Sequence, residues 1–323
     1  MTTHAIVMHE TGGPEVLRWE PIELPAPAAG EARVRHAAIG LNFIDTYHRT
    51  GLYPTPLPAV LGSEGAGVVE AVGAGVENLR VGDRVAYATG PLGAYAEARN
   101  VPGAHLVKVP SSIDDRTAAA VMLKGLTAHY LVEMLPRGTG ADRPLALVQA
   151  AAGGVGLLLT QWLKSRGATV IGTVGSEEKA ALARENGCDH VVLYRHEDVA
   201  SRVRALGGAH VAYDSVGKDT FHASLDCLRP RGLLVTFGQS SGPVGPFDPR
   251  LLAQKGSLSL TRPKLGDFTV GGELPVRAKA LFEAIGSGVL RVRIAQTYPL
   301  RDAATAHRDL EDRKTVGSTL LLP

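Results

Sequence analysis

The chain has 323 residues, which is too long for one ordinary domain and suits two. Its 34 basic and 32 acidic residues give a net charge of +2, and it carries no polybasic block or basic stripe interleaved with aromatics, so nucleic acid is not expected as a partner. The composition, 45% hydrophobic and 5% aromatic, favours α/β layers over a disulfide scaffold. Two cysteines, Cys188 and Cys227, cannot build a disulfide framework or a four-cysteine zinc site, and reduced thiols indicate a cytoplasmic protein.

The first third of the sequence predicts a β-rich domain. Short runs rich in Val, Ala and Ile are separated mostly by Gly, Pro or Asp; they include HAIVMHE, EARVRHAAIG, AGVVEAVG, RVAYAT, YAEARNV and LVKVP. The stretch GAGVVEAVGAGVENLRVGDRVAY is typical of a small twisted barrel. The N-terminal segment contains acidic residues and no apolar run, so a signal peptide is not expected.

From Ser111 the pattern becomes helical and then alternates between strands and helices. The stretch SSIDDRTAAAVMLKGLTAHYLVEML has a Ser/Asp start and apolar residues at helical spacing. The predicted strands that follow are LALVQA, ATVIGTV, HVVLY, HVAYDSV, LLVTFG and SLSLTR. The predicted helices between them are GVGLLLTQWLKSRG, SEEKAALARENG, EDVASRVRALGG and DTFHASLDCLRPRG. This alternation, with nearly continuously apolar strands, predicts a doubly wound parallel sheet and an α/β fold class.

After Pro263 the alternation stops. The stretches ELPVRAKALFEAIGSG and LRDAATAHRDLEDR are expected to be helices, and STLLLP a closing strand. We expect this tail to return to the first domain. The predicted domains are therefore residues 1–124 completed by 266–323, and residues 125–265.

One uncharged segment, Leu145–Leu163, is long enough to cross a bilayer. It contains Gln149, Thr160 and Gln161, and a Gly-Gly-x-Gly break lies in its middle. A buried strand followed by a buried helix accounts for it better than a membrane span does, so no membrane association is expected.

The turn inside that segment, AAAGGVG, predicts a dinucleotide site. It lies between an apolar strand and a helix that begins near Val155, which is the place of the glycine-rich turn in a Rossmann unit. Gly153 and Gly154 allow backbone N–H groups to approach a pyrophosphate, and Gly156 allows the helix to pack closely on the sheet. Ala151 replaces the first glycine of the usual motif, which is tolerable if its φ is negative.

The end of the second strand distinguishes between the two nicotinamide cofactors. NAD sites usually place an Asp or Glu there to bind the ribose 2′-OH, whereas this strand ends in GTVGSEEK without a carboxylate. Gly175, Ser176 and Lys179 offer N–H groups, a hydroxyl and an ammonium, which suit a 2′-phosphate. Glu177 and Glu178 face solvent or repel the phosphate. The pattern favours NADPH over NADH.

Many further stretches resemble one known family. They are GGPEVL, AIGLNFIDTYHRTGLYP, LGSEGAGVVEAVG, VGDRVAY, LKGLTAHYL, AAAGGVG, YDSVG, GSLSLTRP and VGSTLLLP, and they span essentially the whole chain. In these stretches and in its order of domains the chain resembles the medium-chain dehydrogenase/reductase superfamily, and within it the zeta-crystallin-type NADPH:quinone oxidoreductases. The resemblance implies a GroES-like β-rich catalytic domain joined to a Rossmann domain.

The resemblance also implies a set of cofactor-binding residues. The loop from Asn42 to Tyr47 would lie beside the nicotinamide, Gly154 and Val155 at the pyrophosphate, and Tyr194 on the adenine. The full set expected at the cofactor is Phe43, Ile44, Asp45, Thr46, Tyr47, Tyr130, Gly153, Gly154, Val155, Gly156, Gly175, Ser176, Lys179, Tyr194, Ser215, Thr236, Phe237, Gly238, Gln239 and Arg313. A flat ring after the third strand and a fixed cation on a returning tail independently favour Tyr194 and Arg313.

No metal site is expected. Alcohol dehydrogenases of the superfamily take zinc ligands from an early cysteine and a Gly-His-Glu motif, where this chain has Asn42 and the Ser63 of LGSEGAG. No His-Glu-x-x-His motif or other close ligand pair occurs among the 11 histidines, and His48, His105 and His129 are interpreted as ordinary surface or core residues.

Quinone reduction does not require a metal. A quinone is already electrophilic, and hydride addition gives a delocalised hydroquinone anion that water can protonate, so the protein needs mainly to position NADPH and the ring. Asn42 and Tyr47 are the expected donors to a quinone oxygen, with Tyr53 at the cleft mouth, as positioning groups rather than obligate acids. An NADPH-dependent enone or alkenal double-bond reductase and a non-enzymatic NADPH-binding protein, crystallin-like or RNA-binding, remain the alternatives.

The stretch KGSLSLTR is a candidate edge strand at the end of the cofactor sheet. An exposed edge requires cover, and the family pairs this strand with its copy in a second subunit. We therefore expect a homodimer formed through Ser257–Arg262.

Overall fold

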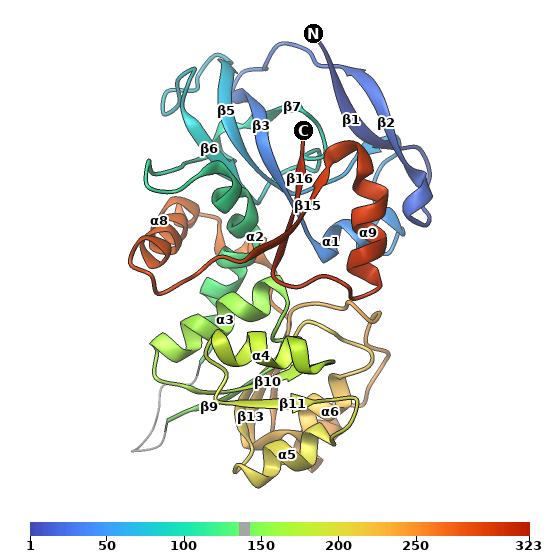
Figure 1. The fold of residues 1–323 in the computed structure, drawn as a ribbon, viewed down its shortest axis with the longest axis vertical. Coiled ribbons are helices and arrows are strands. Elements are labelled where there is room, and N and C mark those ends of the chain that lie inside the picture. The colour runs from blue at the N-terminus through green and yellow to red at the C-terminus, as the bar shows by residue number, and fades with distance from the viewer. Residues whose placement is uncertain (136–142) are drawn as a thin grey trace. The chain divides into compact units, whose positions relative to one another are not determined.

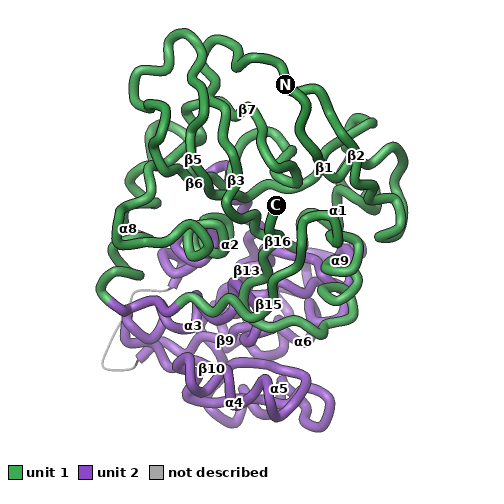
Figure 2. Tube along the Cα trace, turned by 45° about the horizontal axis from the view of Figure 1, so that its top comes forward, with its two compact units in different colours: residues 1–126, 269–287, 292–323 green, residues 127–268, 288–291 purple. Residues whose placement is uncertain are grey.

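The computed structural model describes residues 1–135 and 143–323, and the chain forms two compact units (Figure 2). Unit 1 comprises Met1–Leu126, Thr269–Ser287 and Val292–Pro323, and unit 2 comprises Thr127–Phe268 and Gly288–Arg291. The limits between the units lie within a few residues of the predicted domain limits, except that residues 288–291 belong to unit 2. The assignment of these units as domains stays a prediction.

Unit 1 contains two β-sheets (Figure 1). The larger has the order β15-β16-β3-β5-β6-β8, with β7 also paired to β3, and the smaller has the order β2-β1-β4. The strands are β1 (Thr2–Met8), β2 (Leu17–Glu23), β3 (Glu31–Leu41), β4 (Ala59–Val60), β5 (Glu64–Val72), β6 (Arg84–Tyr87), β7 (Ala98–Pro102), β8 (Val107–Lys108), β15 (Ile294–Pro299) and β16 (Ser318–Leu322). Alternate residues of β3, such as Ala32 and Val34, are buried, because successive side chains of a strand point to opposite faces.

The C-terminal tail returns to unit 1. Strand β16 runs antiparallel to β3, with Leu320 opposite Gly40, so the last strand joins the sheet of the first domain. The helices whose residues lie wholly or partly in this unit are α1 (Phe43–Arg49), α2 (Asp115–Glu133), α8 (Glu273–Gly286) and α9 (Ala303–Glu311). Short 3-10 turns occur at Pro14–Val16, Gly103–His105 and Leu300–Asp302.

Unit 2 is a doubly wound parallel sheet of order β11-β10-β9-β12-β13-β14. Numbered from β9, this is the 3-2-1-4-5-6 order of a Rossmann fold, so the predicted α/β fold class is confirmed. Its strands are β9 (Leu145–Val148), β10 (Thr169–Val174), β11 (His190–Leu193), β12 (Ala209–Asp214), β13 (Leu228–Thr236) and β14 (Ser259–Thr261). Its helices are α3 (Gly154–Ser165), α4 (Glu177–Glu185), α5 (Val199–Ala205), α6 (Phe221–Asp226) and α7 (Arg250–Gln254), with a 3-10 turn at Leu265–Phe268.

The layers of unit 2 follow from its apolar residues. Helices α3 and α4 lie on one face of the sheet and α5 on the other (Figure 1). Leu147, Ile171 and Leu234 of the strands share one buried cluster with Val203 of α5 and Phe221 of α6. The strands are apolar along their length because helices cover both faces of a parallel sheet.

Two predicted elements differ from the structure. The helix predicted over 219–232 ends at Asp226, and strand β13 begins at Leu228 instead of Leu233. Pro230 lacks an N–H group and disfavours a continued helix, whereas an extended strand accepts it here. Strand β14 is shorter than the predicted Ser257–Arg262, and Ser257 has a positive φ of 58°.

The uncharged segment 145–163 forms β9 and then most of α3, as predicted. Over the residues that the structure describes, no helix combines the length and the apolar character needed to cross a bilayer.

Candidate functional site

The glycine-rich turn links β9 to the start of α3. Gly153 is the N-cap of α3, with φ −78° and ψ 170°, and no side chain caps the helix. Residues 153–155 are partly exposed, while Ala151 and Ala152 behind them are buried. An uncapped helix N-terminus presents N–H groups to an anion, and the helix dipole adds to the attraction.

The backbone strain of the turn lies at Ala150 rather than at Ala151. Ala150 has a φ of 53°, in the left-handed region that a residue with a Cβ enters at a cost of about 1–2 kcal/mol, whereas Ala151 is not in that region. Thr173 offsets this strain, because its Oγ1 accepts from Ala150 N at 3.3 Å and its carbonyl accepts from Ala151 N at 3.1 Å. The alanine at the first glycine position is therefore compatible with the turn.

A buried polar network joins the carboxyl ends of three strands. Thr173 of β10 donates to Gln149 Oε1 at 2.5 Å, and Gln149 Nε2 donates to Ser224 Oγ at 3.0 Å. Ser224 donates to Asp214 at the end of β12 at 2.9 Å. Each of these four side chains is at most 4% exposed, so each depends on the others for its hydrogen bonds. Sequence reasoning missed this network because its members are 10 to 75 residues apart.

The carboxyl end of β10 gathers polar and basic groups. Ser176 caps α4, and its Oγ accepts from Lys179 N at 3.3 Å. A methyl group at Gly175 would lie 2.6 Å from the Tyr194 hydroxyl and 3.5 Å from Arg195 Nε, so these two side chains lie directly over the glycine. Tyr194 is 40% exposed and Arg195 is exposed. Arg195 was missed in the sequence, although it directly follows the tyrosine that was singled out.

The two glutamates that follow β10 do not fill the place of a ribose-binding acid. Glu177 and Glu178 lie in the exposed first turn of α4. The Glu177 side chain is 75% exposed and reaches Arg184 at 4.0 Å, farther along its own helix. The carboxyl end of β10 is thus free of a carboxylate, as the sequence predicted.

The remaining unit 2 candidates follow β12 and β13. A methyl group at Gly238 would lie 2.5 Å from the Ser215 carbonyl, so the two strand ends approach closely. Arg262 donates to Thr236 Oγ1 at 3.2 Å, Gly238 O at 3.3 Å and Gln239 Oε1 at 3.1 Å. The sequence predicts Arg262 at the end of the edge strand, and its guanidinium also binds the segment 236–239, which includes Phe237.

Tyr130 is almost completely buried in unit 2. Its ring stacks on Phe268 with centroids 4.4 Å apart and an interplanar angle of 12°. Burial raises the pKa of its hydroxyl above the usual value, with Arg262 acting in the opposite sense. Its expected place along the cofactor stays a prediction.

In unit 1 the expected nicotinamide loop forms the start of α1. Asn42 precedes the helix, and Asp45, Thr46 and Tyr47 are buried, while Phe43 and Ile44 are partly buried. The Tyr47 ring meets Tyr53 edge-on with centroids 5.3 Å apart, so the two expected positioning tyrosines lie together. The Asp45 side chain is fully buried, which leaves no exposed carboxylate oxygen for a cofactor.

The Asn42 amide is held by a buried carboxylate. Its Nδ2 donates to Glu64 Oε2 at 2.8 Å, and the same carboxylate accepts from Lys124 Nζ at 3.0 Å and from Leu123 N at 2.7 Å. Glu64 is fully buried and Lys124 is 5% exposed. The sequence predicts that Asn42 donates to a quinone oxygen, but its Nδ2 also donates to Gly40 O at 3.3 Å, so both of its N–H groups have partners within the protein. Sequence reasoning missed Glu64 and Lys124, and a charged pair inside apolar stretches is the signal that could have found them.

Arg313 follows α9 in unit 1. It is exposed and has a φ of 60°. Its expected contact with the cofactor stays a prediction.

The residues present do not fit a catalytic zinc. Ser63 is partly buried and is not a usual zinc ligand, and Asn42 is engaged with Glu64. Within residues 1–135 and 143–323, no three His, Cys, Asp or Glu side chains lie together as potential metal ligands. His48 contacts Thr55 at 2.8 Å, His105 contacts Thr89 at 3.0 Å, and the His129 ring meets Trp162 edge-on, so each of the three has a local partner.

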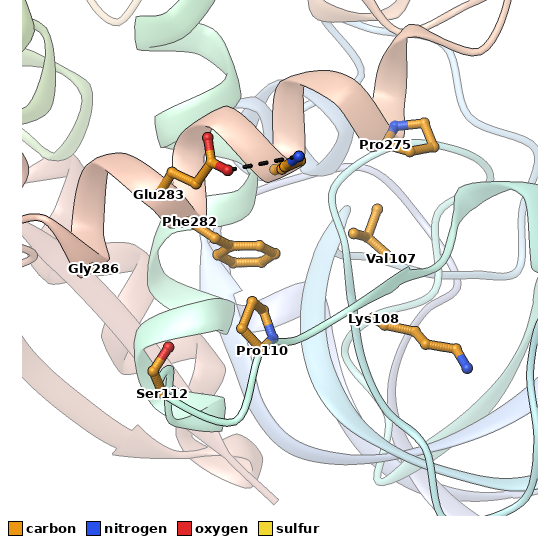
Figure 3. Close-up of a pocket in the computed structure, with 9 residues that line it drawn as sticks. Val107, Lys108, Pro110, Ser112, Pro275, Phe282, Glu283 and Gly286 are labelled. Atoms are coloured by element: carbon orange, nitrogen blue, oxygen red, sulfur yellow. Dashed lines mark ion pairs between the residues drawn. The ribbon is translucent and has the colours of Figure 1, made fainter.

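A separate hollow of about 650 Å³ lies in unit 1 beside α8 (Figure 3). Its lining is Val107, Lys108, Pro110, Ser112, Pro275, Lys279, Phe282, Glu283 and Gly286. The Phe282 ring faces Pro110, and the charges of Lys279 and Glu283 pair at 3.8 Å. None of the predicted site residues lines it.

Two family models match the chain. Residues 28–111 match the alcohol dehydrogenase GroES-like domain, and residues 154–269 match the zinc-binding dehydrogenase family. The GroES-like match lies in unit 1, and the second match begins at the N-terminus of α3 and covers most of unit 2. Together with the Rossmann order of unit 2, they define an oxidoreductase of the medium-chain dehydrogenase/reductase class.

Full-length relatives narrow this class. A quinone oxidoreductase of Pseudomonas aeruginosa is 53% identical over 97% of each chain, and a 2-haloacrylate reductase of a Burkholderia species is 45% identical over 99% of this chain and 98% of its own. The structure of Escherichia coli quinone oxidoreductase complexed with NADPH matches with a TM-score of 0.94 and 46% identity, over 100% of both chains. The chain belongs to the quinone oxidoreductase family.

The turn allows a matched pair of glycine substitutions. In Gly156→Ala the new methyl group would lie 2.4 Å from the Ala150 carbonyl, so strand and helix must separate, and we expect a loss of about 1–3 kcal/mol in stability. This outweighs the gain of about 1 kcal/mol that Ala ordinarily has over Gly in a helix. In Gly153→Ala the nearest atom, the Ala150 carbonyl oxygen, is 3.2 Å away and φ is ordinary, so a smaller loss of stability is expected. Thermal unfolding followed by circular dichroism measures both, and equal midpoints would contradict the predicted close packing.

Proposed function

We propose that this protein is an NADPH:quinone oxidoreductase that moves a hydride to a quinone without a metal ion. The observation that carries the proposal is the carboxyl end of β10, where Tyr194 and Arg195 cover Gly175 and no carboxylate is present. Membership of the quinone oxidoreductase family, with full-length coverage, supports the acceptor class. Two buried free thiols, with the pKa of Cys188 raised to about 11 by burial, fit the proposed cytoplasmic location.

Unit 2 supplies groups for each phosphate. The uncapped N-terminus of α3 suits a pyrophosphate, and Gly154 and Val155 lie there. The N-terminus of α4 with Lys179 suits a 2′-phosphate, and Arg195 adds a planar cation that can bind two phosphate oxygens. Tyr194 is exposed enough to cover an adenine ring. NADPH, when bound, supplies the hydride.

The residues of unit 1 position the quinone and do not act as an acid or a base. Tyr47 and Tyr53 lie edge to face, and we assign their hydroxyl groups to orienting the quinone. Glu64 and the Gly40 carbonyl accept both N–H groups of the Asn42 amide, so we assign Asn42 to shaping the substrate site and not to donating to the quinone. A hydroquinone anion is delocalised and takes its proton from water, so no Lewis acid is needed.

A second candidate function is reduction of an electron-poor double bond. The 2-haloacrylate reductase relative, at 45% identity, favours this alternative. Both reactions begin with hydride attack on a conjugated acceptor, so the same unit 2 groups serve either one.

An acceptor panel tests the proposed function. We expect NADPH oxidation with 1,4-benzoquinone and a naphthoquinone to exceed that with 2-chloroacrylate and an alkenal by at least tenfold in kcat/KM, because only a quinone accepts hydride without activation. The measurement is loss of absorbance at the NADPH band. Faster turnover of 2-chloroacrylate would favour the alternative, and turnover of no acceptor would exclude both.

Substitutions that remove a positive charge near the carboxyl end of β10 test the assignment of NADPH as the cofactor. In Lys179→Ala and in Arg195→Ala we expect the Kd for NADPH to rise about tenfold or more while that for NADH stays the same, because each loses a charge-assisted hydrogen bond worth about 1.5–3 kcal/mol. Arg184→Ala is the matched control, since Arg184 lies on the same helix but faces Glu177. Calorimetric titration gives both constants. An unchanged NADPH/NADH ratio in both variants would overturn the assignment.

We also propose a homodimer through β14. This strand pairs with β13 alone in the sheet that the structure describes, so its other side is an edge that a second copy could extend. Light scattering behind size-exclusion chromatography should give about twice the chain mass of 33.9 kDa. A mass of one chain would contradict the dimer.

A further inference from the structure

A continuous chain of hydrogen bonds crosses the interior of unit 1. Arg49 pairs with both oxygens of Glu311 at 2.9 and 2.7 Å and contacts His307 Nδ1 at 3.0 Å. His307 Nε2 contacts the Tyr95 hydroxyl at 2.9 Å, and that hydroxyl donates to Asp45 Oδ2 at 2.9 Å. The chain thus connects α9, which carries His307 and Glu311, with α1, which carries Asp45 and Arg49. We call these five residues the α9–α1 relay.

The direction of the donors in the relay follows from the chemistry of its members. A guanidinium only donates, so His307 Nδ1 must accept from Arg49, and the ring proton must lie on Nε2. His307 then donates to Tyr95, and Tyr95 donates to Asp45. Burial, with Arg49 acting in the same sense, lowers the pKa of His307 to about 3, which agrees with a neutral ring. From Arg49 through His307 and Tyr95, each of these hydrogen bonds is therefore donated toward the Asp45 carboxylate, while Arg49 also donates to Glu311 at the other end of the relay.

The relay ends on the backbone of the expected nicotinamide loop. Asp45 Oδ2 also accepts from Asn42 N at 2.9 Å, directly before α1. Glu64 holds the side chain of the same Asn42. Two fully buried carboxylates therefore fix one residue, Asp45 at its backbone and Glu64 at its amide.

We propose that Tyr95 and His307 are positioning residues: they transmit the placement of α9 to Asp45 and so fix Asn42 and Tyr47 for hydride transfer. This proposal rests on the proposed reductase function for its kinetic part. Its structural part, that the relay fixes the start of α1, stands on the hydrogen bonds alone.

Unit 1 contains a second hydrogen bond between a buried tyrosine and a buried histidine, and neither residue belongs to α1. The Tyr87 hydroxyl contacts His36 Nε2 at 2.7 Å, and His36 Nδ1 contacts the Ala96 carbonyl at 2.6 Å. Both tyrosines are fully buried. Tyr87→Phe therefore removes a buried tyrosine–histidine hydrogen bond, as Tyr95→Phe does, without changing a residue of the relay. In Tyr95→Phe the ring should keep its place, because it packs against Gly62, where a methyl group would lie 2.3 Å from Tyr95 Cδ1.

The test compares these two variants in the full chain. In Tyr95→Phe we expect faster amide hydrogen exchange over residues 42–49, a kcat for 1,4-benzoquinone lowered about tenfold, and a Kd for NADPH within twofold of wild type. In Tyr87→Phe we expect unchanged exchange over these residues and a kcat within twofold, with a comparable loss of thermal stability.

A pH profile of kcat separates positioning from simple loss of stability. Burial raises the pKa of Asp45 to about 7, while its bonds to Asn42 and Tyr95 and the charge of Lys124 lower it, and Glu64 raises it. Removing the Tyr95 hydroxyl removes a lowering influence, so the pKa of Asp45 rises further and its carboxylate protonates at higher pH. Arg49 and the neutral His307 lie farther along the relay, beyond Tyr95. The acidic limb of kcat should therefore move to higher pH in Tyr95→Phe and stay in place in Tyr87→Phe.

Two results would overturn the proposal. Unchanged exchange over 42–49 in Tyr95→Phe would show that the relay does not fix α1, whatever the activity. Equal kinetic losses and equal pH profiles in the two variants would show a general effect of lost stability. If Tyr95→Phe does not fold, His307→Gln against His36→Gln makes the same comparison. Wild-type protein without quinone turnover would refute the proposed function instead, and exchange would still decide the structural part.

Discussion

A buried carboxylate must be paired, and unit 1 is organised by two of them. Glu64 and Asp45 are both fully buried, and Glu64 pairs with Lys124; removal of one partner from such a buried charged pair costs about 3–5 kcal/mol. Glu64, at the start of β5, joins the start of α1 to α2, since Asn42, Leu123 and Lys124 all donate to it. Asp45 accepts a hydrogen bond from Tyr95, which connects it through His307 to α9. The start of α1 can hardly move without breaking a hydrogen bond to one of these two buried carboxyl groups.

Unit 2 meets a different constraint. The carboxyl ends of parallel strands must remain open to a ligand, yet polar groups gather there and need partners. Gln149, Thr173, Ser224 and Asp214 satisfy one another behind the turn, and the exposed side of the turn keeps an uncapped helix N-terminus. The polar groups on the interior side of the turn are thus satisfied by one another, while the N–H groups on its outer side have no side-chain cap.

The predicted cofactor-binding residues and the predicted catalytic residues differ in how much of the sequence is needed to predict their surroundings. The strand–turn–helix around Gly153 and the strand end at Gly175 can each be predicted from a short stretch of sequence. The structure has both in the predicted places. The hydrogen bonds of Asn42 could not be predicted from its neighbours in the sequence, because its amide nitrogen donates to Glu64, which is 22 residues away. Arg262 was assigned to a dimer edge by strand pattern, while its guanidinium binds segment 236–239.

The sequence by itself determined the alternation of strands and helices in the Rossmann unit, the position of its glycine turn, the lack of a carboxylate after β10 and the presence of Asn42 and Ser63 in place of zinc ligands. These follow from residue type and short-range periodicity. Only the tertiary structure decided which buried polar groups meet, such as Tyr95 with His307, 212 residues apart, and Arg49 with Glu311, 262 residues apart. Periodicity assigns a residue to a face of a strand or helix, but a hydrogen bond between distant segments depends on how whole elements pack.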